Sequence, residues 1–147
     1  GDEINIIKPG LNYGWPVITY GRAYASDPEG KKSGLPPPTV QPPTSFEGMV
    51  EPVTYYKPSI AIAGLVFYTG DKFPQWKGNL FVAGMAGQQV SRLTMKGQFV
   101  AGRETMAEQM GRIRDIRQGL DGFIYLAMED REGKPTSVVR LEPVERK

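Results

Sequence analysis

The chain has 147 residues, the size of one ordinary globular domain, and a hydrophobic fraction of 39% that is enough to build a packed core. Its net charge of +2 is too small to indicate nucleic acid as the main partner, and no apolar run is long enough to span a membrane. The chain contains neither cysteine nor histidine. This excludes disulfides, thiolate metal sites, and any triad, zinc site or general base that needs a histidine from this chain alone.

Proline and glycine divide the chain into two parts of different character. The sequence opens at Gly1 with a strand-like pattern and no methionine, so we expect a piece of a longer protein or a processed product. Eleven of the 13 prolines fall between Pro9 and Pro74, and residues 21–52 lack apolar periodicity. Such a stretch favours either a functional loop or a linker. Because too little chain precedes it to form a domain, we expect a docking loop within one part that spans residues 1–147.

The second half of the chain shows short apolar stretches separated by turns. These candidate strands lie at residues 65–69, 79–84, 90–94, 98–101, 112–117, 123–128 and 137–141. Residues 104–110 predict a helix-like or irregular break between two strand clusters. Clusters of this size favour two blades of a β-propeller, at roughly 64–103 and 112–142, preceded by a strand near 3–8. An open antiparallel sandwich is the alternative, and the fold class is all-β in both cases.

The most specific motif is the run R-I-R-D-I-R at residues 112–117. In a strand, a period of two places Arg112 and Arg114 side by side on one face and Arg117 on the other. Two planar cations at this spacing suit a ligand that carries carboxylates or phosphates. The alternative is an exposed strand edge on which Asp115 is the ion-pair partner.

Three further motifs leave alternatives open. Asp2 and Glu3 would point to opposite faces of a strand, so they are solvated charges, unless one of them binds calcium together with backbone carbonyls. The run Y-Y-K-P-S at residues 55–59 either lines a sugar or cofactor pocket or packs its tyrosines in the interior. The run N-Y-G-W-P at residues 12–16 is typical of a tight turn whose aromatics cap a core.

Five segments occur in a fixed order along the chain: Gly1–Asn5, Asn12–Pro16, Phe67–Trp76, Gly111–Arg117 and Asp121–Leu126. This series resembles the carboxy-terminal part of soluble PQQ-dependent aldose sugar dehydrogenases, the glucose/sorbosone dehydrogenase family. The resemblance runs from Gly1 to about Pro143, which is essentially the whole chain.

The resemblance implies part of a six-bladed β-propeller, periplasmic or secreted, that oxidises the C1 hydroxyl of aldose sugars to lactones. In such proteins pyrroloquinoline quinone (PQQ) accepts the hydride, calcium polarises the quinone, and a histidine is the base. The resemblance places Arg112 and Arg114 beside the carboxylates of PQQ and Tyr24 in a loop near this cofactor. Glu3, with the backbone carbonyl of Tyr13, falls where some members hold a second, structural calcium.

The sequence also departs from the family pattern. The family's catalytic histidine belongs to an earlier blade, so we expect no catalytic residue in this chain. Ala86, within Gly84–Gln88, stands where many members carry a PQQ-binding lysine. Residues 25–50 align poorly, so this loop is the protein's own. The alternative function is therefore a non-catalytic, propeller-like module that binds a sugar or a protein.

Part of a propeller leaves blade faces without the neighbours they normally pack against. We therefore expect this chain to associate with itself or with the remainder of its parent propeller, and the intact protein to take an aldose sugar as substrate. The exposed apolar residues would include Leu65, Phe67, Leu80, Val82, Ile124 and Leu126.

Overall fold

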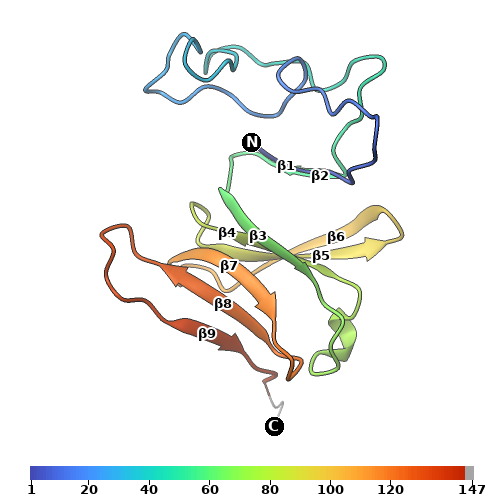
Figure 1. Ribbon diagram of the computed structural model, residues 1–147, viewed down its shortest axis with the longest axis vertical. Helices are drawn as coiled ribbons and strands as arrows, with labels where there is room; N and C mark the ends of the chain where they lie inside the picture. Colours follow the sequence, from blue (N-terminus) through green and yellow to red (C-terminus); the bar gives the residue numbers. More distant parts are fainter. Residues whose placement is uncertain (145–147) are drawn as a thin grey trace. The chain divides into compact units, whose positions relative to one another are not determined.

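The computed structural model describes residues 1–144 and comprises two compact units, Gly1–Ser59 and the chain from Ile60 onward (Figure 1). Within the described residues the regular structure is almost entirely β-strand, and the one helical element is a single 3-10 turn, η1 (Pro74–Trp76). Over the same residues, no helix has the length and apolar character that crossing a membrane requires. The expected all-β fold class is confirmed.

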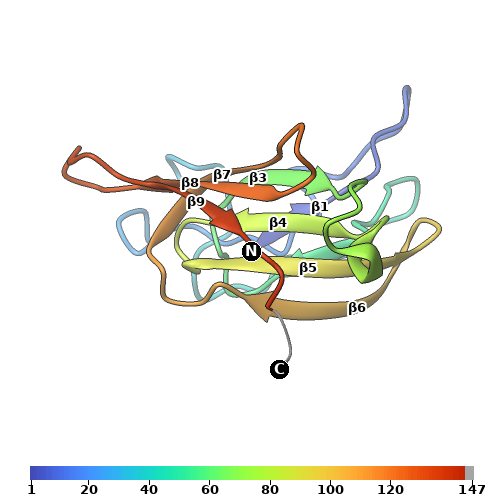
Figure 2. The ribbon, with the colours of Figure 1, turned by 90° about the horizontal axis from the view of Figure 1, so that it is seen from below.

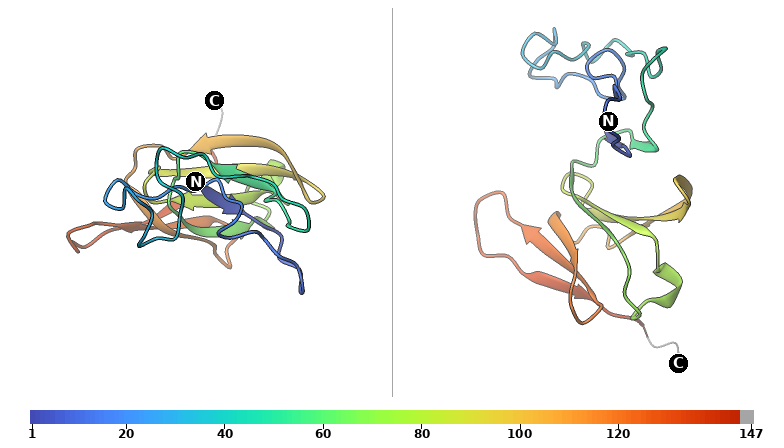
Figure 3. Two further views of the ribbon diagram at one scale, coloured as in Figure 1. Left: turned by 90° about the horizontal axis from the view of Figure 1, so that it is seen from above. Right: turned by 45° about the vertical axis from the view of Figure 1, so that its right-hand side comes forward.

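The first unit holds two short strands. β1 (Asp2–Ile4) pairs antiparallel with β2 (Thr54–Tyr56). The chain between them is irregular, and residues 21–52 contain neither helix nor strand, as the blue and cyan trace in Figure 3 shows. β1 is shorter than the strand expected near 3–8. The sequence does not predict β2, whose three residues lie among prolines.

Backbone hydrogen bonds and turns hold the loops of the first unit. The amide of Ala23 donates to the carbonyl of Pro36 (3.0 Å), which joins the start of the proline-rich loop to its middle. Gly30 has a φ of +71°, and a Cβ there would lie 1.9 Å from the carbonyl oxygen of Leu35. This turn therefore requires glycine for its backbone conformation and also for its close approach to another segment of backbone.

The second unit contains two antiparallel sheets, with strand orders β3-β4-β5-β6 and β7-β8-β9. The strands are β3 (Ile62–Phe67), β4 (Leu80–Gly84), β5 (Gln89–Lys96), β6 (Phe99–Met106), β7 (Arg112–Gln118), β8 (Ile124–Glu129) and β9 (Val138–Leu141). Figure 2 shows β4, β5 and β6 following one another in sheet order. The sheets match the two expected blades, but residues 104–106, expected in an irregular break, instead complete β6.

The two sheets of this unit share one apolar core. All five positions of β4 are buried, as is typical of a strand covered on both faces. β7 packs against β3 and β4, which joins the second sheet to the first. The core cluster consists of Tyr68, Phe73, Phe81, Ala83, Val90, Ile113, Ile116, Ile124 and Leu126.

This shared core corrects one expectation about exposed blade faces. Four of the residues expected on them are buried: Leu80, Val82, Ile124 and Leu126. They are covered because the two sheets and the segments between them pack on each other within the unit. Leu65 and Phe67 on β3 do remain exposed, at 45% and 53% of their surface.

An irregularity in β3 lies where this strand meets β7. Ile62 pairs with Gly84 and Gly64 pairs with Ala83, so Ala63 is an extra residue, a β-bulge. A Cβ at Gly64 would lie 2.4 Å from Asp115 Oδ1 on β7. Glycine at this position therefore lets the two sheets approach closely.

Candidate functional site

The strand that carries the arginine motif contains a β-bulge at Arg114. Ile113 pairs with Met128 and Asp115 pairs with Ala127, which leaves Arg114 without an opposite residue on β8. Ile113 and Ile116 are both fully buried although they are three residues apart. Strict alternation along this strand, as expected from the sequence, is therefore wrong beyond Arg114.

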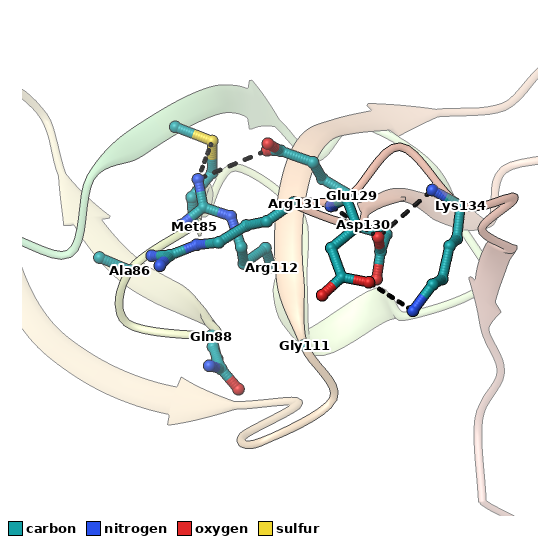
Figure 4. Close-up of a pocket in the computed structure, with 10 residues that line it drawn as sticks. Met85, Ala86, Gln88, Gly111, Arg112, Glu129, Asp130, Arg131 and Lys134 are labelled. Atoms are coloured by element: carbon teal, nitrogen blue, oxygen red, sulfur yellow. Dashed lines mark hydrogen bonds and ion pairs between the residues drawn. The ribbon is translucent and has the colours of Figure 1, made fainter.

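The two arginines nevertheless meet at one point, on Met85 of the β4–β5 turn. Figure 4 shows Arg112 at this point. Arg112 Nη2 lies 3.4 Å and Arg114 Nη1 lies 2.9 Å from the Sδ atom of Met85. The same two nitrogens lie 3.6 Å and 3.7 Å from Glu129 Oε2, at the end of β8. Two guanidinium groups therefore share one thioether and one carboxylate.

This cluster has unused hydrogen-bonding capacity. Arg112 Nε and Glu129 Oε2 are buried and have no hydrogen-bond partner among the described residues. The ion-pair distances exceed those of a hydrogen bond, so Glu129 offsets the arginine charge without satisfying the donors. Because two cations face one anion here, the cluster is suited to bind a further anionic group.

An open cavity of about 460 Å³ adjoins the cluster. It lies between the β4–β5 turn, the start of β7 and the loop after β8. Its lining residues are Met85, Ala86, Gln88, Gly111, Arg112, Glu129, Asp130, Arg131, Glu132 and Lys134. The predicted arginine motif thus borders a cavity large enough to hold part of a planar cofactor.

Asp115 is an ion-pair partner within the motif, as the alternative interpretation expects, but its partner is Arg117. Its carboxylate pairs with Arg117 at 3.1 Å and accepts the backbone amide of Ile116 at 2.9 Å. Arg112 and Arg114 pair instead with Glu129. Their ion-pair partner is therefore the acidic residue of the neighbouring strand.

The expected calcium ligands lie in the first unit. Glu3 Oε1 accepts the backbone amide of Tyr20 at 3.1 Å, whereas Asp2 Oδ1 accepts the hydroxyl of Ser59 at 2.7 Å. The two adjacent carboxylates thus have different partners, as expected for neighbours in a strand. The hydroxyl of Tyr13 donates to the carbonyl of Ile6 at 2.8 Å. Within the described residues, no three acidic, histidine or cysteine side chains gather as a metal-binding group.

The other aromatic candidates of this unit differ in exposure. Tyr24 is 77% exposed, and its carbonyl accepts the amide of Asp27 at 2.8 Å. Tyr56 is buried, whereas Tyr55 stacks on Tyr20 with ring centroids 3.6 Å apart. Of the two tyrosines at residues 55–56, one therefore packs in the interior and the other forms an aromatic pair.

Met85 and Glu129 are members of the cluster that the sequence pattern does not predict. The hairpin between β7 and β8 pairs Gln118 with Ile124. Counting back from this pair without a bulge places Asp130, rather than Glu129, opposite Arg112. An acidic partner is therefore predictable from the register, but its identity depends on the bulge.

Comparisons with known proteins show the family to which the chain belongs. The sequence matches the family described as Glucose / Sorbosone dehydrogenase over residues 1–140. It is 37% identical to aldose sugar dehydrogenase YliI of Escherichia coli, over 91% of this chain and 34% of that protein. The chain thus spans about a third of the length of the curated relatives it matches.

Solved structures show the same relationship. A crystal structure of a glucose dehydrogenase superposes with a TM-score of 0.79 at 36% identity, covering 98% of this chain and 38% of the other. The PQQ-bound aldose sugar dehydrogenase of Streptomyces coelicolor has a TM-score of 0.62 over 96% of this chain and 36% of its own. At 24% identity, that second likeness concerns the fold alone. Together with the family match, these similarities show that the chain belongs to the glucose/sorbosone dehydrogenase family.

Proposed function

We propose that this chain supplies the arginine-lined side of a PQQ site in a sugar dehydrogenase. The observation that carries the proposal is the convergence of Arg112 and Arg114 on Met85, where both also form an ion pair with Glu129. PQQ is a planar quinone with carboxylate groups, and its carboxylates match the donors that the cluster leaves unused, including the buried Arg112 Nε. The residues present therefore fit this cofactor.

Bound PQQ would supply the two-electron acceptor for oxidation of an aldose at its C1 hydroxyl to the lactone. In this scheme Arg112 and Arg114 hold and orient a carboxylate, and Tyr24 belongs to a loop near the cofactor. The chain contains no histidine, so the base that removes the hydroxyl proton would come from outside these residues. Association with the remainder of the propeller, or of the chain with itself, and a periplasmic or secreted location belong to the same proposal.

The cofactor assignment is tested by comparing two arginines of the same strand. We expect Arg112→Ala in the full-length protein to weaken PQQ binding by about 100-fold or more, because it removes a largely buried cation from a carboxylate. Arg117→Ala is the matched control, since Arg117 is paired with Asp115. Titration of both apo variants with PQQ gives the two affinities. Equal affinities would contradict the assignment, and a wild-type protein that binds no PQQ would favour a non-catalytic binding module.

Calcium binding by Glu3 and the carbonyl of Tyr13 is a second part of the proposal. A carboxylate together with backbone carbonyls is a set of hard oxygen donors, which suits calcium. The half-buried Glu3 carboxylate, held by the amide of Tyr20, supports this role. We expect calcium to raise the melting temperature of the wild type and of Asp2→Asn, but not of Glu3→Gln. A calcium response that survives Glu3→Gln would contradict it.

A further inference from the structure

The loop after β8 contributes a third cation to the cavity that borders the arginine cluster. Arg131 and Ala86 both line this cavity. Figure 4 shows the Arg131 side chain extending across it, with the guanidinium on the side of Ala86, whereas Arg112 turns toward Met85. The two guanidinium groups therefore reach different parts of one cavity.

The acidic residues of this loop are already engaged with other groups. Asp130 Oδ1 accepts the backbone amides of Glu132 at 2.8 Å and Lys134 at 3.3 Å. The carboxylate of Glu132 pairs with Lys134 Nζ at 2.5 Å. Within the described part of the chain, the guanidinium of Arg131 has no ion-pair or hydrogen-bond partner. It is therefore the cation of this cavity whose charge no neighbouring carboxylate offsets.

The opposite wall leaves space for this guanidinium and for a ligand group beside it. Ala86 carries only a methyl group. A Cβ at Gly87 would lie 2.9 Å from the Cβ of Ile60, so this position of the turn is restricted to glycine. The β4–β5 turn thus presents a small wall without charge opposite Arg131.

We propose that Arg131 is a specificity-determining residue that binds a second carboxylate of the ligand, separate from the one held by Arg112 and Arg114. The site then selects planar ligands that carry at least two carboxylates on different edges. This inference rests on the proposed function, which assigns to the site PQQ, a ligand of that class. A guanidinium supplies two parallel donors to a carboxylate, which fixes the orientation of the ligand as well as holding it.

The test measures PQQ binding to the full-length apo protein by titration calorimetry. We expect Arg131→Ala to weaken binding about tenfold or more, and Arg131→Lys to recover part of the loss. Lys134→Ala is the matched control, because it removes the same charge from the same loop at a residue already paired with Glu132. The trimethyl ester of PQQ is the ligand control, and its binding should be the same in the wild type and in Arg131→Ala.

The outcomes separate this inference from the proposed function. If Arg112→Ala weakens PQQ binding and Arg131→Ala does not, the inference fails and the proposed function stands. Equal losses in Arg131→Ala and Lys134→Ala would indicate only a general effect of charge, which also overturns the inference. If neither Arg112→Ala nor Arg131→Ala changes the affinity, both are wrong. Arg131 and Lys134 are exposed, so thermal melts of Arg131→Ala and Lys134→Ala should match the wild type.

Discussion

The two units of this chain reach a defined conformation by different physical means. The first has two three-residue strands, and its loops are fixed by turns, glycine conformations and isolated backbone hydrogen bonds. In the second, the described residues form seven strands around a shared apolar core. Burial of apolar surface offsets the entropy of ordering the chain far better than isolated hydrogen bonds do. The arginine cluster therefore has a stiff support, whereas the candidate calcium ligands lie in the unit with fewer cooperative contacts.

Truncation of a core isoleucine in each unit gives the largest expected contrast. Ile116→Ala should lower the free energy of unfolding of the second unit by about 2–5 kcal/mol, because Ile116 is fully buried between two sheets. Ile18 is only 3% exposed. Ile18→Ala should nevertheless lower the free energy of unfolding by less, because irregular loops can move into the cavity that the substitution leaves. Hydrogen exchange resolved by unit measures both effects in the full-length protein. Equal losses of unfolding free energy in Ile116→Ala and Ile18→Ala would contradict the proposed difference between the two units.

Two glycines of the proline-rich loop distinguish backbone strain from steric contact. Both Gly30 and Gly34 have positive φ, so alanine should cost about 1 kcal/mol at either position. Only at Gly30 would the new Cβ meet backbone, at Leu35, whereas at Gly34 the space is open. We therefore expect Gly30→Ala to lower the free energy of unfolding by about 1–3 kcal/mol more, because the new methyl group overpacks the turn.

Limited proteolysis within residues 21–52 measures this difference, because the loop should be cleaved faster in Gly30→Ala than in Gly34→Ala. The hydrogen bond between Ala23 and Pro36 provides an independent local probe, since its amide should lose protection in the same order. Identical cleavage rates for the two variants would show that the close approach to Leu35 does not support the loop.

A matched pair of tyrosine hydroxyls gives a smaller contrast. The hydroxyl of Tyr68 donates to the carbonyl of Gly122 at 2.8 Å and accepts the amide of Phe73 at 3.0 Å. Tyr68 and Phe73 are buried. Tyr68→Phe should cost about 1–2 kcal/mol, because it leaves a buried amide unsatisfied. Tyr13→Phe removes an exposed hydroxyl that water can replace and should cost about 0.5 kcal/mol or less. Chemical denaturation of both variants measures the two costs, and a reversed order would be the contrary result.

The smallest effect is the pH dependence of the proline-rich loop in the first unit. The hydroxyl of Ser33 donates to Asp27 and, with backbone amides, lowers the pKa of this carboxyl below its ordinary value. Its stabilising contribution is therefore complete above the pKa of the unfolded chain, about 3.9, and is lost as the pH falls through the lower folded value. Protection factors of the loop amides, which correct for the intrinsic pH dependence of exchange, should fall on acidification in the wild type. Asp27→Asn should show no such change over this range.

The sequence predicts the second unit well because its signals are local. Alternating apolar residues in β8 and the Asp121-Gly122 turn indicate both a strand and its reversal. β2 is not predictable in the same way, because its three residues form a strand through pairing with β1, about fifty positions away in the chain. The alternation of apolar and polar residues in such a short segment therefore does not indicate a strand.

The candidate site shows the same division. The arginine pair is predictable, since two arginines in alternate positions have a local pattern. The contacts with Met85 and Glu129 are not, because they depend on how β7 lies against the β4–β5 turn and on the extra residue in β7. A bulge changes the register without changing the composition of the strand, so a rule based on alternation does not detect it.

The bulge at Arg114 also bears on how a ligand contact can be gained or lost during evolution. Without Arg114, the order Ile113-Asp115-Ile116 would alternate strictly, and both isoleucines would keep the buried face that they occupy now. The arginine is therefore an additional residue in a strand whose core pattern is already complete. A single in-frame codon separates a strand that carries this contact from one that lacks it, with the same hydrophobic core in both.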